Sequence, residues 1–311
     1  MATDVRTIKF TNVVKEQLFN GAEFVKKAVN HSSYIRDLTV EIPIAGSLPD
    51  VVVDRSSFPI AVTTRTDTKQ SYNIKEYSVG TLKLAEKDMK ELSYDKAKSI
   101  IKGHVDALND RIGLDGAYNW GASLAANQVR TSGTATANIA PPDGTGNRKS
   151  LKLTDLAIAA KILDKQKISK NVKRYCLMSS DMYWDFVREN YTELQNYNYN
   201  FANNVNSDIS TGQSALIYGF NIMQRAETLV YTNDSTPVKK AVGAVGATTD
   251  NWAAICWQED EVAYAYGSPK LYLETNSATF QGDLLSGTQR FNNTTMRTDE
   301  TGLVTIVQAA G

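Results

Sequence analysis

Only two side chains in this sequence could supply histidine chemistry. His31 and His104 are the two imidazoles among 311 residues, and a catalytic triad or a zinc centre needs a histidine with suitable partners. His31 lies in the polar segment Asn30 to Ser33, which predicts a solvent-exposed side chain. His104 lies on an apolar helical stripe, which predicts a hydrogen-bonded packing residue. Neither histidine predicts an active site.

The two cysteines give no better indication of a chemical site. Cys176 and Cys256 stand far apart in the sequence, each inside an apolar run, and neither has a Cys or His at metal-ligand spacing. We expect reduced residues of the core.

The run from Gly144 to Ser150 is similar to a phosphate-binding loop, but it departs from that motif at two points. Arg148 stands where the second glycine of G-x-x-x-x-G-K-S is required, and Pro141 and Pro142 precede it where a buried strand is needed. A flexible interdomain loop is the expected structure.

Three consecutive acids, Glu259 to Glu261, could form a divalent-cation or acid–base site, but a solvated hairpin turn between two strands is favoured. Four nearby aromatic residues could stack on sugar or nucleic acid, although their alternation with alanine favours core and interface packing. These aromatic residues are Trp252, Trp257, Tyr264 and Tyr266. No hydrolase, redox, zincin or EF-hand motif occurs. We therefore predict no enzyme, and no catalytic, cofactor-binding or metal-binding residue.

Charge and hydropathy narrow the class of protein further. Lys plus Arg and Asp plus Glu both total 34, so no net positive charge attracts the chain to nucleic acid or to anionic lipid. No apolar run reaches the ~18 residues of a membrane span. We expect a cytoplasmic product without a targeting signal, in which most of the chain folds.

The elements that would position these residues are of mixed type. Alternation from Leu38 to Ile44 predicts a strand, at a sheet edge because of Pro43, and the β-prone stretch to Leu84 predicts a long two-stranded excursion with a polar tip. A helix of about five turns follows Ser93, and Gly103 within it suggests close packing. Residues 131–150 form a connection. The remainder mixes helices with a mostly β C-terminal third, so the expected class is α+β.

Five segments carry a resemblance to a known family. They are Ala254–Gln258, Gly267–Leu271, Gln281–Ser286, Arg297–Gln308 and Tyr175–Trp184. The first four, in this order, resemble successive segments of the major capsid proteins of tailed bacteriophages with the Hong Kong 97-type fold. Tyr175–Trp184 resembles the strand and following helix of that family's axial domain. The resemblance covers nearly the whole chain. No long, charged, helical prodomain precedes the arm, which implies either a processed form or a lineage with a separate scaffolding protein.

The resemblance implies a division of the chain into five parts. They are an N-terminal arm (1–37), an extended β-hairpin loop (38–84), a peripheral domain with a long spine helix (85–150), an axial domain (151–264) and return strands of both domains (265–311). It also implies self-assembly into pentamers and hexamers that form the icosahedral head of a virion in the host cytoplasm. The implied partners are further copies of the chain, scaffolding, portal and decoration proteins, and double-stranded DNA contacted without sequence specificity, but no membrane.

Two other classes stay open from the sequence. An encapsulin-like compartment would have the same fold around a cargo enzyme, and portal and terminase genes beside this one would favour a phage instead. A β-rich sugar-binding or tail-fibre protein is suggested by the aromatic strands and the Asn-rich stretch from Asn190 to Gly212. A small trimer in gel filtration would support that class.

Overall fold

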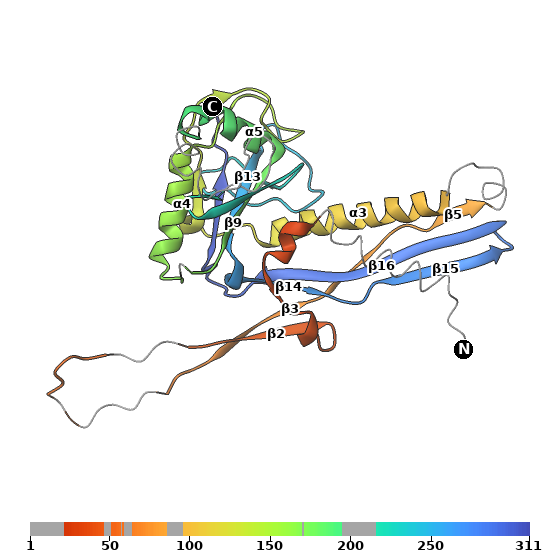
Figure 1. Ribbon diagram of the computed structural model, residues 1–311, viewed down its shortest axis with the longest axis horizontal. Helices are drawn as coiled ribbons and strands as arrows, with labels where there is room; N and C mark the ends of the chain where they lie inside the picture. The colour runs from red at the N-terminus through yellow and green to blue at the C-terminus, as the bar shows by residue number, and fades with distance from the viewer. Residues whose placement is uncertain are drawn as a thin grey trace, which may run out of the picture.

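The computed structural model describes residues 22–46, 51–56, 58, 64–85, 96–169, 171–194 and 216–311. Figure 1 shows a compact part and two long features that leave it in different directions. One is the helix α3 (Lys96–Asn119) with the strands β15 (Lys270–Ser277) and β16 (Gly282–Thr295). The other is the hairpin of β2 (Thr39–Ile44) and β3 (Thr68–Asn73). The two long features leave much of the described chain outside the compact part.

A seven-stranded mixed sheet forms the centre of the compact part. Its strand order is β10-β11-β9-β13-β17-β6, and β12 also pairs with β13. The bounds of these strands are β6 Gln128–Arg130, β9 Arg174–Ser179, β10 Leu216–Ile217, β11 Phe220–Arg225, β12 Leu229–Tyr231, β13 Asn251–Gln258 and β17 Leu303–Val307. The compact part thus contains strands from outside residues 151–264, the range that the resemblance assigns to the axial domain.

Both faces of this sheet are covered. Side chains alternate between the faces along a strand, so Cys176 and Met178 of β9 pack with α4 (Leu153–Lys165) and α5 (Ser180–Glu189). Tyr175 and Leu177 point to the opposite face. Burial of both faces explains why β9 and β13 are nearly continuous apolar runs in the sequence.

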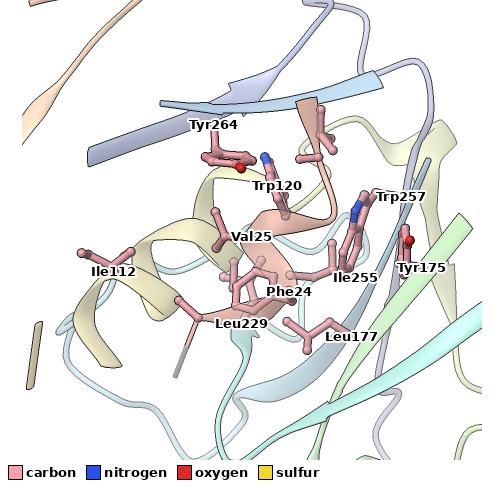
Figure 2. Packing of buried hydrophobic residues seen from close by; sticks show 14 of the residues in the cluster. Phe24, Val25, Ile112, Trp120, Tyr175, Leu177, Leu229, Ile255, Trp257 and Tyr264 are labelled. Carbon is pink, nitrogen blue, oxygen red and sulfur yellow. The ribbon is translucent and has the colours of Figure 1, made fainter. Parts of the chain in front are cut away.

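The second face packs on aromatic side chains from three distant segments (Figure 2). Trp120, just after α3, lies 5.3 Å from Trp257 of β13 between ring centroids, and Tyr175 lies 5.7 Å from the same indole. Phe24, in the short turn η1 (Glu23–Lys26), lies edge-on to Trp120 at 5.8 Å. This cluster joins the segment before the hairpin, the helix and the sheet into one core.

A second, six-stranded sheet runs beside α3 (Figure 1). Its order is β1-β14-β16-β15, and β4 and β5 pair with β16. The bounds not yet given are β1 Val29–Asn30, β4 Lys75–Ser78, β5 Leu82–Ala85 and β14 Val262–Tyr266. At ~3.3 Å per residue β16 extends roughly 46 Å, and the 24-residue helix α3 extends about 36 Å. The helix and the sheet run side by side (Figure 1), and α3 contacts β16.

The hairpin is shorter than the sequence predicts. β2 and β3 pair in register from Thr39 opposite Asn73 to Ile44 opposite Thr68. The later residues of the predicted excursion, in β4 and β5, pair with β16 instead. The prediction of a two-stranded excursion to Leu84 was wrong there, because the partner strand lies some 200 residues further along the chain and local alternation cannot reveal it.

The predicted helix is confirmed, with one difference at Gly103. Val105, Leu108 and Ile112 of α3 are buried on one face, as the apolar stripe predicts. Ser93 lies outside the described residues, so its capping role stays a prediction. The close packing expected at Gly103 is wrong, since among the described residues a Cβ at this position would meet no atom within 4 Å beyond the adjoining residues and backbone of its own helix.

The remaining described elements are short. They are η2 (Ser32–Tyr34), η3 (Ala125–Asn127), β7 (Ala135–Thr136), β8 (Arg148–Lys149) and η5 (Glu259–Glu261). β7 and β8 form a small antiparallel pair of their own. The class is α+β, as expected.

Candidate assembly interface

The two histidines lie on different elements, and the environment of each differs in one respect from the prediction. His31 is half-buried rather than exposed, and its ring lies edge-on to Tyr34 at 5.8 Å. His104 is buried as predicted, but neither ring nitrogen has a hydrogen-bond partner among the described residues. Burial lowers the pKa of both imidazoles, so the folded protein favours their neutral forms.

The cysteines are neighbours in space despite their separation in sequence. Cys176 of β9 is directly opposite Cys256 of β13, and their Sγ atoms lie 3.2 Å apart. Both are free and fully buried, which confirms the prediction of core residues. The sequence could have revealed this contact only through the pairing of the two strands.

The run from Gly144 to Ser150 is a fixed part of the compact fold, so the prediction of a flexible loop was wrong. Arg148 is buried, and its guanidinium donates to the backbone oxygens of Asp250, Thr248 and Thr145 at 2.9–3.2 Å. Its donors are therefore satisfied within the chain, where a phosphate site would need them free.

The acidic cluster is a crossover between sheets and not a hairpin turn. η5 connects β13 of the seven-stranded sheet to β14 of the six-stranded sheet, and the two strands do not pair with each other. Burial raises the pKa of Glu261, while Arg297 at 3.7 Å acts against that rise. Among the described residues no group of three His, Cys, Asp or Glu side chains could hold a metal ion.

The four aromatic residues behave as packing residues. Trp252 is buried on the face of the sheet that α4 and α5 cover. Trp257 and Tyr264 are buried in the opposite cluster, and Tyr266 packs against that cluster. Their rings are therefore turned away from solvent and could not serve as a platform for sugar or nucleic acid.

The base of the hairpin is held by its own chain. Val40 and Ile42 of β2 pack with Tyr72 of β3 and with Ala265 of β14. On the outer face, Lys69 Nζ lies 2.6 Å from Glu41 Oε1 across the two strands. The hairpin base thus has an apolar face covered by β14.

The end of the hairpin has the opposite character. Val51 and Val53 are 83% and 81% exposed, Phe58 is 72% exposed, and Val52 is half exposed. Just before the loop, Asp67 Oδ1 accepts a hydrogen bond from the Gly46 nitrogen at 2.8 Å, which keeps the two strands together up to this point. The paired strands thus carry the segment 51–56 far from the compact part (Figure 1), and the valine side chains of this segment are exposed.

The sequence contained a signal for this surface that the polarity of residues 63–71 obscured. Three successive β-branched valines, Val51 to Val53, stand between Asp50 and Asp54. A strand inside a sheet with one wet face would alternate apolar and polar residues, and a run of three leaves at least one valine uncovered.

The six-stranded sheet also has a free edge. In the described part of the chain β15 pairs with β16 on one side and with nothing on the other. Tyr272 on this strand is 53% exposed. Unpaired strand edges are sites at which another chain can add, unless charge or a covering segment prevents it.

The helices in the described residues fall short of the combined length and hydropathy needed to span a bilayer.

Comparisons with known proteins give a match by structure alone. No protein-family model matches the chain, and no curated protein sequence is significantly similar to it. A chain from the capsid of cyanophage P-SCSP1u superposes with a TM-score of 0.62 at 16% identity, covering 92% of this chain and 87% of that one. A chain from the capsid of Ralstonia phage GP4 gives 0.63 at 11% identity with the same coverage. For the capsid of cyanophage Pam1 the values are 0.62 and 11%, covering 92% and 90%. Over almost its whole length, this chain has the mixed α+β fold of tailed-phage capsid subunits.

Proposed function

We propose that the chain is the major capsid protein of a tailed bacteriophage, a subunit without catalytic activity that forms the icosahedral head. The observation that carries this proposal is the structural likeness to phage capsid chains over 92% of the sequence. The proposal includes the Hong Kong 97-type division into arm, hairpin loop, peripheral domain, axial domain and return strands.

The exposed end of the hairpin supplies a physical basis for assembly. Burying a valine or phenylalanine side chain contributes about 1.5–3 kcal/mol, and Val51, Val53 and Phe58 are largely uncovered in the single chain. When one surface of a subunit binds a different surface of the next subunit, the subunits form a closed ring if the rotation between neighbours divides a full turn evenly. Pentamers and hexamers built in this way repeat a weak contact around a closed path, and the repetition stabilises the whole.

The remaining partners follow from the same proposal. Assembly would take place in the host cytoplasm with a scaffolding protein and a portal, and decoration proteins could join the finished head. A formal net charge of zero suits a wall that contacts packaged double-stranded DNA without binding it strongly or reading its sequence.

The direct test is negative-stain electron microscopy of the expressed protein, alone and together with a scaffolding protein if one is encoded in the same genome. Closed particles of uniform size are expected. A small oligomer under both conditions, or a monomer with measurable catalytic turnover, would contradict the proposal.

A matched pair of variants tests the role of the hairpin end. The double substitution Val51→Asp and Val53→Asp introduces charge into the proposed contact and should reduce the particle yield in sedimentation at least tenfold. Val245→Asp is the control, because Val245 is 92% exposed and lies in the compact part. Circular dichroism should be unchanged in both variants. Normal shells from the double variant would rule out this contact.

A further inference from the structure

Two thiols lie face to face in the middle of the seven-stranded sheet. β9 and β13 are antiparallel neighbours, and Cys176 is in register with Cys256. Their Sγ atoms are 3.2 Å apart, and both side chains are fully buried in the same apolar cluster. Two sulfurs so close, on strands that form the centre of the sheet, make a pair of neighbouring thiols and not two separate packing residues.

The strand geometry allows a covalent bond between them. Directly opposite residues of an antiparallel pair have Cα atoms about 4.5–5.5 Å apart, within the roughly 4.4–6.8 Å span of disulfide-bonded cysteines. The sulfurs need to approach by only about 1.2 Å to reach the ~2.05 Å bond length. Small rotations about the two Cα–Cβ bonds supply that movement without displacing either backbone.

The reduced pair is stable under reducing conditions. The Cys256 thiol donates to the Cys176 sulfur, and burial raises the pKa of Cys256, so the reactive thiolate is scarce in the closed sheet. Oxidation of the two thiols therefore requires the sheet to open locally, and we expect the oxidation to be slow.

We propose that Cys176 and Cys256 form a reversible disulfide bond between β9 and β13 when the protein enters oxidising surroundings. With a small-molecule disulfide such as oxidised glutathione, one thiolate attacks the reagent and releases one glutathione thiol. The second cysteine then attacks the mixed disulfide and releases the other. The two protein thiols lose two electrons and two protons, and the reagent accepts both as two glutathione thiols.

The bond would tie together distant parts of the compact fold. It links residues 80 positions apart, and the enclosed chain contains α5, β11 and β12. Closing a long loop restricts the unfolded chain more than closing a short one. The oxidised protein should therefore resist unfolding better than the reduced protein, and this follows whether or not the chain builds a shell.

The test uses the full chain, incubated with oxidised glutathione a few degrees below its thermal transition, where backbone amide exchange shows that β9 opens. Mass spectrometry of non-reduced peptides should find one species that joins the peptide containing Cys176 to the peptide containing Cys256. The oxidised protein should then melt roughly 5–10 °C above the same sample after reduction.

Single variants provide the control. Cys176→Ala and Cys256→Ala each leave one thiol, so oxidant should leave the Tm of each variant within about 1 °C of its reduced form. Each protein is compared with its own reduced form, so the packing lost in the variants does not affect the difference in Tm. The proposal would be overturned if both thiols stayed free after β9 has opened. It would also be overturned if glutathione adducts did not convert to the internal disulfide, or if disulfides formed between chains instead.

Discussion

Asn292 on β16 donates a hydrogen bond from Nδ2 to the backbone oxygen of Asn73, 2.6 Å away, at the point where the hairpin meets the long sheet. Asn119, the last residue of α3, donates to the Oδ1 atoms of Asn292 and Asn293 at 3.0 and 2.7 Å. Asn293 in turn donates to the Gly116 oxygen of the helix at 2.9 Å. These amides hold the hairpin, β16 and α3 in one arrangement.

Substituting Asn292→Ala should destabilise the protein by about 1–3 kcal/mol. The change removes the donor to the Asn73 backbone oxygen and the acceptor of Asn119 Nδ2 and of the buried Asn293 nitrogen, so these groups keep fewer partners. Chemical denaturation measures the loss, and amide exchange in β3 should become faster than in the wild type. Asn171→Ala, at an exposed position, should change the free energy of unfolding by less than about 0.5 kcal/mol. Equal effects of the two substitutions would show that the amide cluster does not stabilise the junction.

Two glycines of α3 should respond differently to substitution by alanine. In the described part of the chain a Cβ at Gly103 meets no atom within 4 Å outside its own helix turn, so Gly103→Ala should stabilise the helix by about 0.5–1 kcal/mol. A Cβ at Gly113 would lie 2.8 Å from the guanidinium of Arg225, which is held 2.7 Å from the Asp110 carboxylate. Gly113→Ala should therefore displace that ion pair and show no gain. Thermal denaturation of both variants checks this, and a similar gain in both would contradict the placement of Arg225.

Local patterns in the sequence predicted local structure well and pairing poorly. Alternation from Leu38 to Ile44 predicts β2, and the apolar stripe through Val105 predicts the buried face of α3. Both patterns arise within one element, where spacing alone determines which side chains share a face. Nothing in Leu82 or Leu84 indicates that the partner of β5 is β16, because pairing over 200 residues depends on the fold as a whole.

The same limit explains the errors at the candidate sites. Strands β13 and β14 flank a short acidic turn, as a hairpin would, yet each is needed in a different sheet. Arg148 looked like a loop residue because its acceptors, the oxygens of Thr248 and Asp250, are contributed by a segment 100 residues later. Cys176 and Cys256 became neighbours for the same reason. The run of valines that includes Val51 can be seen in the sequence. That these side chains are exposed can be seen only in the structure.

His104 should make stability depend on pH below neutrality. Burial lowers its pKa from 6.5 in the folded protein, so the unfolded chain binds a proton more readily than the folded one. The stabilisation is therefore complete above about pH 6.5 and is lost as the pH falls from there towards the lowered pKa. His104→Leu should remove this part of the decline and should be at least as stable as the wild type near neutral pH, since no buried nitrogen then lacks a partner.

The difference between the two proteins is the quantity to measure, because carboxylates titrating near pH 5 contribute equally to both. Urea denaturation at about pH 7.5 and about pH 5.5 gives the two free energies for each protein. Parallel declines of wild type and His104→Leu would mean that the imidazole is not buried in its neutral form.

The last prediction concerns the hairpin and rests on the proposed assembly. In separate subunits the amides of β2 and β3 should exchange quickly towards the loop, since these strands pair only with each other in the described part of the chain. Amides of β9 should exchange slowly, because β9 lies between β11 and β13 and its side chains are almost entirely buried. In assembled particles the end of the hairpin should become at least tenfold slower while β9 is unchanged, as a neighbouring subunit covers Val51 and Phe58. Hydrogen exchange with mass spectrometry on subunits and particles makes the comparison within one protein, so β9 is the internal control. The same slow exchange of the hairpin in both states would show that its own chain already stabilises it, and the contact between subunits would then have to lie elsewhere, at a surface such as the free edge of β15.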